Sequence, residues 1–349
     1  MKKSLLALAA LTAFAGAASA QSSVTLFGIL DLAATSVNNA NAGTLRTLSP
    51  SANATSRLGL RSVEDLGGGM TAGFWLEGEL APDVGGGIHG APSASASAMT
   101  WQRRSTVQLA GSFGEFRMGR DYTPTFSNIS AYDAWGYVGV ATLANVRSTI
   151  GSGAGTAVRA NNAIEYFLPS LGGLYGNVMV SAGENTTGNK YVGGRLGYAA
   201  GPLNVSGAYG KTYKTGAMID DLKTESIGAS FNAGFMTVMG AFEKNDYSSA
   251  SQKLATGAVL VPFGASTLKL SITSTTGSGT TAAAANAYKA KEYGIGYQYD
   301  LSKRTALYAQ YGRVANGSGA KFTASDSGAA GIGAGQTSSG YQFGMRHNF

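Results

Sequence analysis

The chain ends with the stretch Tyr341-Gln342-Phe343-Gly344-Met345-Arg346-His347-Asn348-Phe349. Large side chains occupy the odd positions, and polar or small residues occupy most of the even ones. Successive side chains of a β-strand point to opposite faces, so the two sets would lie on opposite faces of a strand. The stretch therefore predicts a strand that is apolar on one face and polar or small on the other.

The same alternation recurs along the chain. Large side chains alternate with Gly294, Gly296 and Gln298 between Tyr293 and Tyr299. The segment 235–245 is apolar on both faces, so the pattern leaves its register open. Sixteen strands are predicted from period-two alternation, near residues 24–35, 55–64, 70–80, 101–110, 115–121, 160–168, 174–183, 190–200, 203–213, 223–232, 235–245, 253–262, 266–275, 289–299, 305–314 and 340–349.

The connections between these strands alternate in length. The short ones carry turn residues, as in Asp65 to Gly69 and Gly201-Pro202. The long ones are rich in Gly, Ser, Ala and Thr and cover 36–54, 81–100, 122–158, 276–288 and 315–339. Short turns at one end and long loops at the other are typical of outer-membrane barrels.

A sheet in lipid must close, because the bilayer offers no water to an unpaired strand edge. At around sixteen strands the interior is too wide for side chains to fill, so it holds water. We therefore predict an all-β chain: a 16-stranded antiparallel transmembrane β-barrel with short periplasmic turns and long external loops. A soluble β-sandwich is the alternative, but it has no need of sixteen strands with tyrosines near their ends.

Composition agrees with this fold. Among 349 residues there are 51 Gly and no Cys, and only 13% are charged, against about 25% in soluble domains. Lys2 and Lys3, an apolar run and the small residues Ala18-Ser19-Ala20 indicate a secretory signal peptide over 1–20, with the mature barrel at 21–349. Its removal lowers the formal charge of +7 by two, to +5.

The sequence shows no pattern typical of a metal, phosphate or nucleic-acid site. His89 and His347 are far apart and make no metal site, and no cofactor is expected. The glycine runs lack the Lys-Ser/Thr and the helix of a phosphate loop. No basic run is interleaved with aromatic residues, so no nucleic-acid partner is expected.

Several short motifs in order resemble the general porins of Gram-negative outer membranes, in particular the betaproteobacterial-type, anion-selective members. The resemblance spans the mature chain and rests on Ser22 to Gly28, Ser56 to Arg61, Glu64 to Gly69, Phe113 to Asp121, Leu301 to Thr305 and Gly344 to Phe349. It implies a homotrimer in outer-membrane lipid that passes small anions and hydrophilic solutes. It also implies that the third long loop, 122–158, folds into the barrel as a constriction, and that Phe349 is an assembly signal.

Strand parity identifies basic residues of the lumen. Outward Leu58 and Leu60 place Arg57 and Arg61 inside, and the strand 160–168 leaves Arg159 on its inner face. A charged side chain facing lipid at mid-depth would cost about 2–4 kcal/mol, which favours inward placement. In 101–110, parity turns Arg104 inward, whereas the resemblance favours Arg103; a bulge could reconcile the two.

The resemblance further implies a role for these residues. Arg57, Arg103 and Arg159 match a basic cluster that faces the third loop. Glu77, which parity also turns inward, and Asp133 in the loop match an opposing acidic side.

Three other functions are alternatives to a general channel. A substrate-specific porin for organic acids or sugars would line the pore with aromatic residues, and Tyr122, Tyr132, Trp135 and Tyr137 are available in the third loop. A barrel enzyme would gather Asp, His and Ser at one rim, which the two histidines do not allow. An adhesin would act through its long loops. We expect a general diffusion channel with anion preference and no enzymatic activity.

Overall fold

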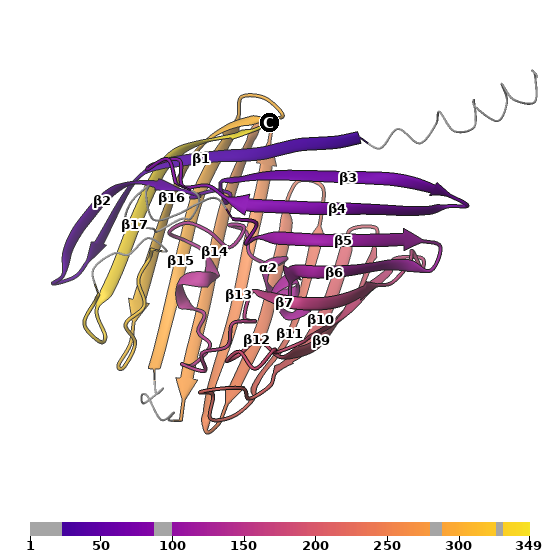
Figure 1. Ribbon diagram of the computed structural model, residues 1–349. Helices are drawn as coiled ribbons and strands as arrows, with labels where there is room; N and C mark the ends of the chain where they lie inside the picture. The colour runs from indigo at the N-terminus through magenta and orange to yellow at the C-terminus, as the bar shows by residue number, and fades with distance from the viewer. Residues whose placement is uncertain (1–22, 87–99, 280–287, 326–330) are drawn as a thin grey trace, which may run out of the picture.

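The computed structural model describes residues 23–86, 100–279, 288–325 and 331–349 (Figure 1). The predicted signal peptide, 1–20, lies outside the described residues. Strands pair into one sheet, in chain order β1 (Ser23–Asn39), β2 (Gly43–Pro50), β3 (Arg57–Gly67), β4 (Met70–Glu79), β5 (Arg104–Gly111), β6 (Gly114–Tyr122), β7 (Arg159–Phe167), β8 (Leu174–Ser181), β9 (Tyr191–Ala200), β10 (Leu203–Thr212), β11 (Leu222–Asn232), β12 (Thr237–Tyr247), β13 (Ala250–Phe263), β14 (Ser266–Ser278), β15 (Tyr288–Asp300), β16 (Thr305–Asn316) and β17 (Thr337–Asn348).

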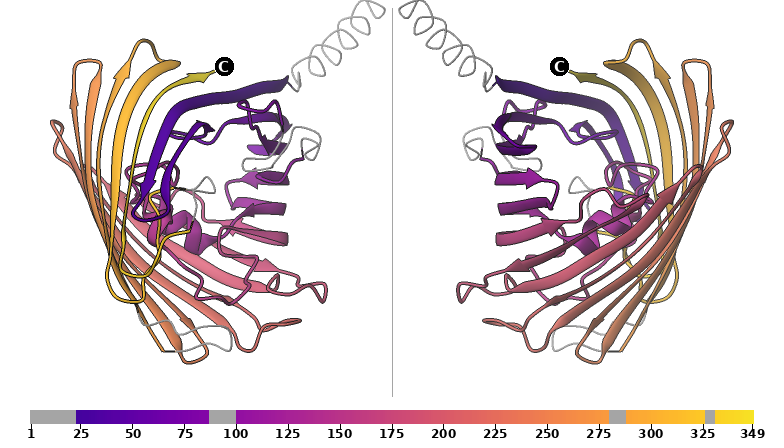
Figure 2. Two further views of the ribbon diagram at one scale, coloured as in Figure 1. Left: turned by 90° about the vertical axis from the view of Figure 1, so that its left-hand side faces the viewer. Right: turned by 90° about the vertical axis from the view of Figure 1, so that its right-hand side faces the viewer.

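The sheet closes on itself. From β3 onward each strand pairs antiparallel with the next, and β17 returns to pair with β1, from Ile29↔Asn348 to Asn39↔Ser338. At the seam Gly28 and Phe349 exchange two backbone hydrogen bonds of 3.0 Å. Closure gives β1 and each strand from β3 to β17 a partner on both sides, as a sheet surrounded by lipid requires. Figure 2 shows the sheet curving around an interior.

Seventeen strands make sixteen positions around the barrel. β2 and β3 both pair with β1, β2 along Leu32–Asn39 and β3 along Ser23–Ile29. They therefore form one interrupted strand, and the predicted 16-stranded antiparallel barrel is confirmed. The prediction of a long loop over 36–54 is wrong, because most of that segment is β1 and β2. Pairing with β1 satisfies the backbone groups along one edge of β2 although its sequence is loop-like.

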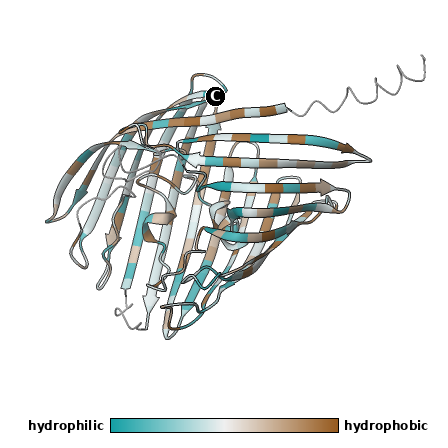
Figure 3. Ribbon diagram, viewed as in Figure 1, coloured by the Kyte–Doolittle hydropathy of each residue, from teal (hydrophilic) through white to brown (hydrophobic). Residues whose placement is uncertain are grey.

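The barrel has its apolar side chains outside. Val107, Phe116 and Ile227 are each about half exposed on the outer face, and Figure 3 shows apolar and polar residues alternating along the strands. Buried polar side chains face inward, among them Glu243, which settles the register of the ambiguous 235–245 strand. This arrangement suits lipid outside and water inside.

The third loop enters the barrel, as predicted. It contains α2 (Pro124–Ser130), capped by the Thr123 side chain, and the 3-10 helix η2 (Leu143–Val146). α2 packs on the inner faces of β9, β10 and β11, and η2 lies against β14 and β15. In the part of the chain that the structure describes, no helix combines the length and apolar character needed to cross a bilayer.

The carboxylate of Asp31 holds the interruption between β2 and β3. It accepts the backbone N–H groups of Ala52, Asn53 and Ala54 at 3.0, 3.2 and 2.9 Å. The hydroxyl of Tyr308, from β16, donates to the same carboxylate. Asp31 is fully buried on β1. One side chain thus replaces the strand pairing that is missing at 51–56.

We predict that Asp31→Ala destabilises the barrel by roughly 3 kcal/mol or more, because three buried N–H groups and one hydroxyl lose their acceptor. The measurement is the temperature at which folded protein is lost on detergent gels, which should fall. Asp65→Ala is the control, since the Asp65 carboxylate accepts one exposed N–H, from Gly67, in a turn. Equal unfolding temperatures for Asp31→Ala and the wild type would contradict this role.

Candidate functional site

Three predicted arginines meet on one wall of the lumen. Arg57 begins β3, Arg103 immediately precedes β5 and Arg159 begins β7. The Arg159 Nε donates to the backbone oxygen of Arg103 at 2.7 Å. Arg103 and Arg159 each donate an Nη2 hydrogen to the hydroxyl of Tyr122, at 2.8 and 2.7 Å. We call Arg57, Arg103 and Arg159 the arginine cluster.

Glu77 belongs to this cluster. Its Oε1 lies 2.6 Å from Arg103 Nε and 3.2 Å from Arg57 Nη1, and Trp75 Nε1 donates to its Oε2. The expectation that Glu77 faces the arginines from the opposite side is therefore wrong. β4, which carries Glu77, lies between β3 and β5, so the carboxylate is a neighbour of both arginines. Two of the three guanidinium groups contact this one carboxylate, and a second carboxylate, that of Glu79, lines the cavity beside them, so the cluster keeps a net positive charge.

Both candidates before β5 lie inside the barrel. Arg103 precedes the regular strand and contacts Glu77, whereas Arg104 lies 3.3 Å from Asp121 and hydrogen-bonds Thr106. The guanidinium of Arg104 sits 4.6 Å from the ring centroid of Trp75, which Arg61 approaches to 5.2 Å. Parity favoured Arg104 and the resemblance favoured Arg103, and both side chains face the lumen. Arg103 belongs to the arginine cluster, whereas Arg104 is paired with Asp121 in a separate group.

Tyr122 is a site residue that the sequence showed only as an aromatic of the third loop. It ends β6, where the loop begins, and its backbone pairs with that of Arg159. Its ring stacks on Phe126 at 4.8 Å, and the guanidinium of Arg159 lies 4.3 Å from its ring centroid. The hydroxyl position could not be read from the sequence, because it depends on two strands brought together by closure.

Two cavities adjoin the arginine cluster. One of about 380 Å³ is lined by Arg57, Arg103 and Arg159 on the wall and by loop residues that include Phe126 and Ser130. A second, of about 280 Å³, is lined by Arg57, Glu77, Arg103, Arg104 and Asp121, among others. Arg57, Arg103 and Tyr122 line both. The cluster therefore lies where the two chambers meet.

Asp133 organises the loop itself. Its carboxylate accepts from Trp135 N, Tyr137 N and the hydroxyl of Thr142, the last at 2.6 Å. Burial raises the pKa of Asp133 above its ordinary value, although these hydrogen bonds act in the opposite direction. The structure does not bring Asp133 into contact with the arginine cluster, so its predicted place on an acidic side of the constriction stays a prediction.

A buried ion pair, which the sequence did not reveal, fastens the loop. Arg147 Nε and Nη2 contact the two carboxylate oxygens of Glu243 at 2.6 and 3.0 Å. Glu243 attracts the guanidinium strongly enough to raise the pKa of Arg147, although burial alone would lower it. The charge of Arg147 is paired, so it adds little to the field of the lumen. The two residues are far apart in sequence, and the open register of the 235–245 strand gave no sign of the contact.

Glycines on the inner wall make room for the loop. A Cβ at Gly294 or Gly296 would lie 2.7 or 2.6 Å from the ring of Trp135. A Cβ at Gly312 would overlap the carbonyl oxygen of Val140, and one at Gly228 would overlap the ring of Tyr132. We call these four glycines the glycine seat. Glycine is required at these inward-facing positions because any larger residue would overlap the loop.

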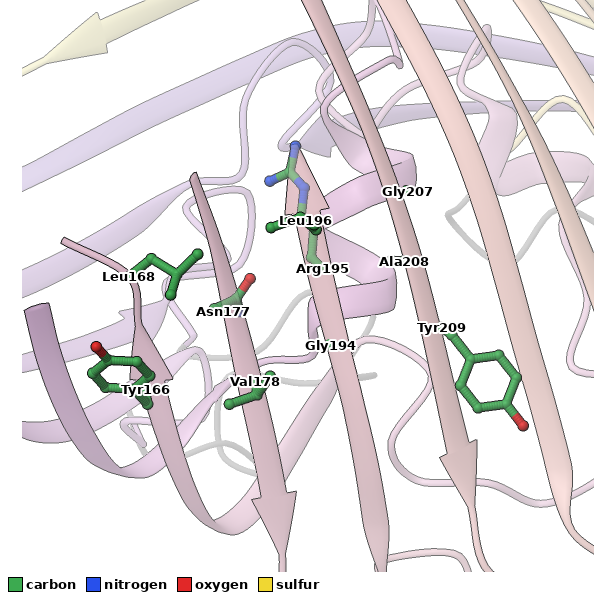
Figure 4. Close-up of a pocket in the computed structure, with 10 residues that line it drawn as sticks. All are labelled: Tyr166, Leu168, Asn177, Val178, Gly194, Arg195, Leu196, Gly207, Ala208 and Tyr209. Atoms are coloured by element: carbon green, nitrogen blue, oxygen red, sulfur yellow. The ribbon is translucent and has the colours of Figure 1, made fainter. Parts of the chain in front are cut away.

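A groove of about 530 Å³ on the outside of β7 to β10 is separate from this site (Figure 4). Outward Val178, Leu196 and Tyr209 line it. Arg195, which precedes Leu196 on β9, points inward, and its Nε donates to Asn128 Oδ1 of α2 at 3.1 Å. The groove therefore lies on the apolar outer face and does not open to the arginine cluster.

Phe349 lies at the barrel seam, and whether it is an assembly signal stays a prediction. Over the described ranges, no group of three or more His, Cys, Asp or Glu residues is placed to hold a metal ion.

Comparisons with known proteins agree with this geometry. A family model described as "Gram-negative porin" matches residues 7–319. The chain is 37% identical to "Outer membrane porin protein 32" of Delftia acidovorans, over all of both chains. It is 28% identical to an outer membrane porin of Bordetella pertussis, covering 90% of this chain and 94% of that one. The solved structure "Anion-selective porin from Comamonas acidovorans" superposes with a TM-score of 0.85 at 33% identity, over 94% of this chain and all of the other.

We predict that Gly312→Ala lowers the single-channel conductance. The added methyl group overlaps the backbone of Val140, so the loop must shift away from the wall and toward the arginine cluster. Gly257→Ala is the matched control on β13, where no heavy atom lies closer than 4.0 Å to a new Cβ. Planar-bilayer recordings in KCl test this. A conductance for Gly312→Ala that equals those of the wild type and of Gly257→Ala would show that the loop tolerates the methyl group.

Proposed function

This chain belongs to the Gram-negative porin family, and from this membership we propose that its diffusion channel through the outer membrane prefers small anions. The channel is a general one, for ions and small hydrophilic solutes. The relative from Comamonas acidovorans is described as anion-selective, which supports the proposed preference.

The arginine cluster is the observation that carries the proposal. Its net positive charge is fixed, because a guanidinium stays protonated at every accessible pH. Low-dielectric walls focus the field of these charges in a narrow passage and raise the local concentration of anions. The charges are spread over β3, β5 and β7, so no single site holds an anion too tightly to leave.

A general channel is favoured over one specific for sugars or organic acids. Of the loop aromatics considered, Tyr132 and Trp135 are buried. Tyr132 hydrogen-bonds Ser206, and Trp135 Nε1 donates to Ser271, both on the barrel wall. These two rings fasten the loop and are not available as an aromatic track for a solute. We propose no catalytic step, since the relatives that match the chain are channels.

We predict that the triple variant Arg57→Ala, Arg103→Ala, Arg159→Ala loses most of the anion preference of the wild type. The measurement is the zero-current potential across a bilayer that separates two KCl concentrations. Selectivity should be strong in dilute salt and fade in concentrated salt, because the Debye length falls from about 10 Å at 0.1 M to about 3 Å at 1 M. A cation-preferring wild type, or an unchanged potential in the triple variant, would refute the proposal.

We also propose that the protein assembles as a homotrimer, as the family resemblance implies. The backbone hydrogen bonds of a closed barrel lie within the protein, so detergent alone should not unfold it. Unheated samples should migrate on detergent gels as a folded oligomer and boiled samples as an unfolded monomer, somewhat smaller than the 35.5 kDa of the full chain once residues 1–20 are removed. Chemical crosslinking should give species up to three chains. Identical migration of both samples at monomer size would count against this assembly.

A further inference from the structure

The hydroxyl of Tyr122 occupies a central place in the arginine cluster. It lies between Arg103 and Arg159 and lines both chambers. Its ring is fixed by stacking on Phe126 and by the guanidinium of Arg159. The oxygen therefore has a defined position beside both chambers.

The hydrogen bonds of this hydroxyl leave one group unused. A phenolic oxygen offers two acceptor lone pairs and one O–H donor. Arg103 Nη2 and Arg159 Nη2 occupy both lone pairs. Across the described residues, the contacts of Tyr122 include no acceptor for its O–H, so the proton is available to the chambers.

A neutral acceptor between two arginines has a specific electrostatic effect. Glu77 holds Arg57 and Arg103 but cancels one of their charges. The Tyr122 hydroxyl holds Arg103 and Arg159 without removing charge. Hydrogen bonds polarise one another in a connected network, so two charged donors make the remaining O–H a stronger donor. The same oxygen can therefore position the cations and present a proton to an anion.

We infer that Tyr122 is a selectivity residue of the channel, whose O–H donates a hydrogen bond to the permeating anion while its oxygen keeps Arg103 and Arg159 in place. This inference rests on the proposed anion preference. Tyr122 would add a neutral hydrogen-bond donor to the charged groups of the arginine cluster, beside both chambers.

The test compares Tyr122→Phe with Tyr175→Phe in planar bilayers with a KCl gradient at low salt. Tyr175 is a matched control on β8. Its hydroxyl accepts from Arg195 Nη2 at 3.3 Å, and the guanidinium lies 5.1 Å from its ring centroid. Its O–H, however, already donates to Asn204 at 2.7 Å. Both variants remove one hydroxyl that contacts an arginine, but only Tyr122→Phe removes a free donor.

Tyr122→Phe should reduce the chloride-to-potassium permeability ratio by about three- to tenfold, the range expected for one hydrogen bond. It should also raise the potassium acetate concentration at which conductance is half-saturated. Tyr175→Phe should match the wild type in both. Migration of unheated samples on detergent gels verifies that both variants are folded.

The outcomes separate this inference from the proposed function. A wild type without anion preference would overturn both. An anion-preferring wild type with an unchanged ratio and half-saturation in Tyr122→Phe would overturn only the role of Tyr122. An equal loss in Tyr122→Phe and Tyr175→Phe would also overturn it, because the effect would then follow from loosening any arginine–tyrosine contact.

Discussion

A backbone N–H or C=O that meets hydrocarbon must find its partner within the chain, and this constraint organises the whole barrel. It pairs each strand with the next and brings β17 back to β1. Where pairing fails, between β2 and β3, the carboxylate of Asp31 accepts the orphaned N–H groups. That interruption ends one residue before Arg57, so the backbone repair also fixes the start of the arginine cluster. The segment 51–56 therefore both satisfies the backbone hydrogen bonds of the barrel and positions the first arginine of the site.

Closure also puts polar side chains on the inside, where a loop can use them. The third loop is held by contacts spread around the wall: Tyr132 to Ser206, Trp135 to Ser271, Val140 N to Gln342 and Arg147 to Glu243. The glycine seat lets the loop approach the backbone of the wall. The loop is thereby confined to the side of β9 to β17, and the open chambers remain beside the arginines. The lumen is thus divided between a packed side and a charged side.

Period-two alternation predicted the strands other than β2, most of their inward faces and the lumenal positions of Arg57 and Arg159. Parity states which face a residue occupies but not which residues meet across it. Glu77 was for that reason assigned to the wrong side, although it lies on the strand between β3 and β5. Arg103 lies before the regular strand, where parity no longer holds. The pairing of Arg147 with Glu243 and the position of the Tyr122 hydroxyl follow from closure and loop packing, which no local pattern contains.

The two ends of the third loop lie side by side. Tyr122 pairs with Arg159 on adjacent strands, and Thr123 N donates to Val158 O at 3.1 Å. The segment between them leaves the barrel wall, runs through the lumen and returns to the same place on the wall. Such a segment can be replaced or lengthened without altering the strand order or the closure of the barrel. Evolution can thus remodel the shape of the passage in one exchange, limited only by which inserts the glycines accommodate.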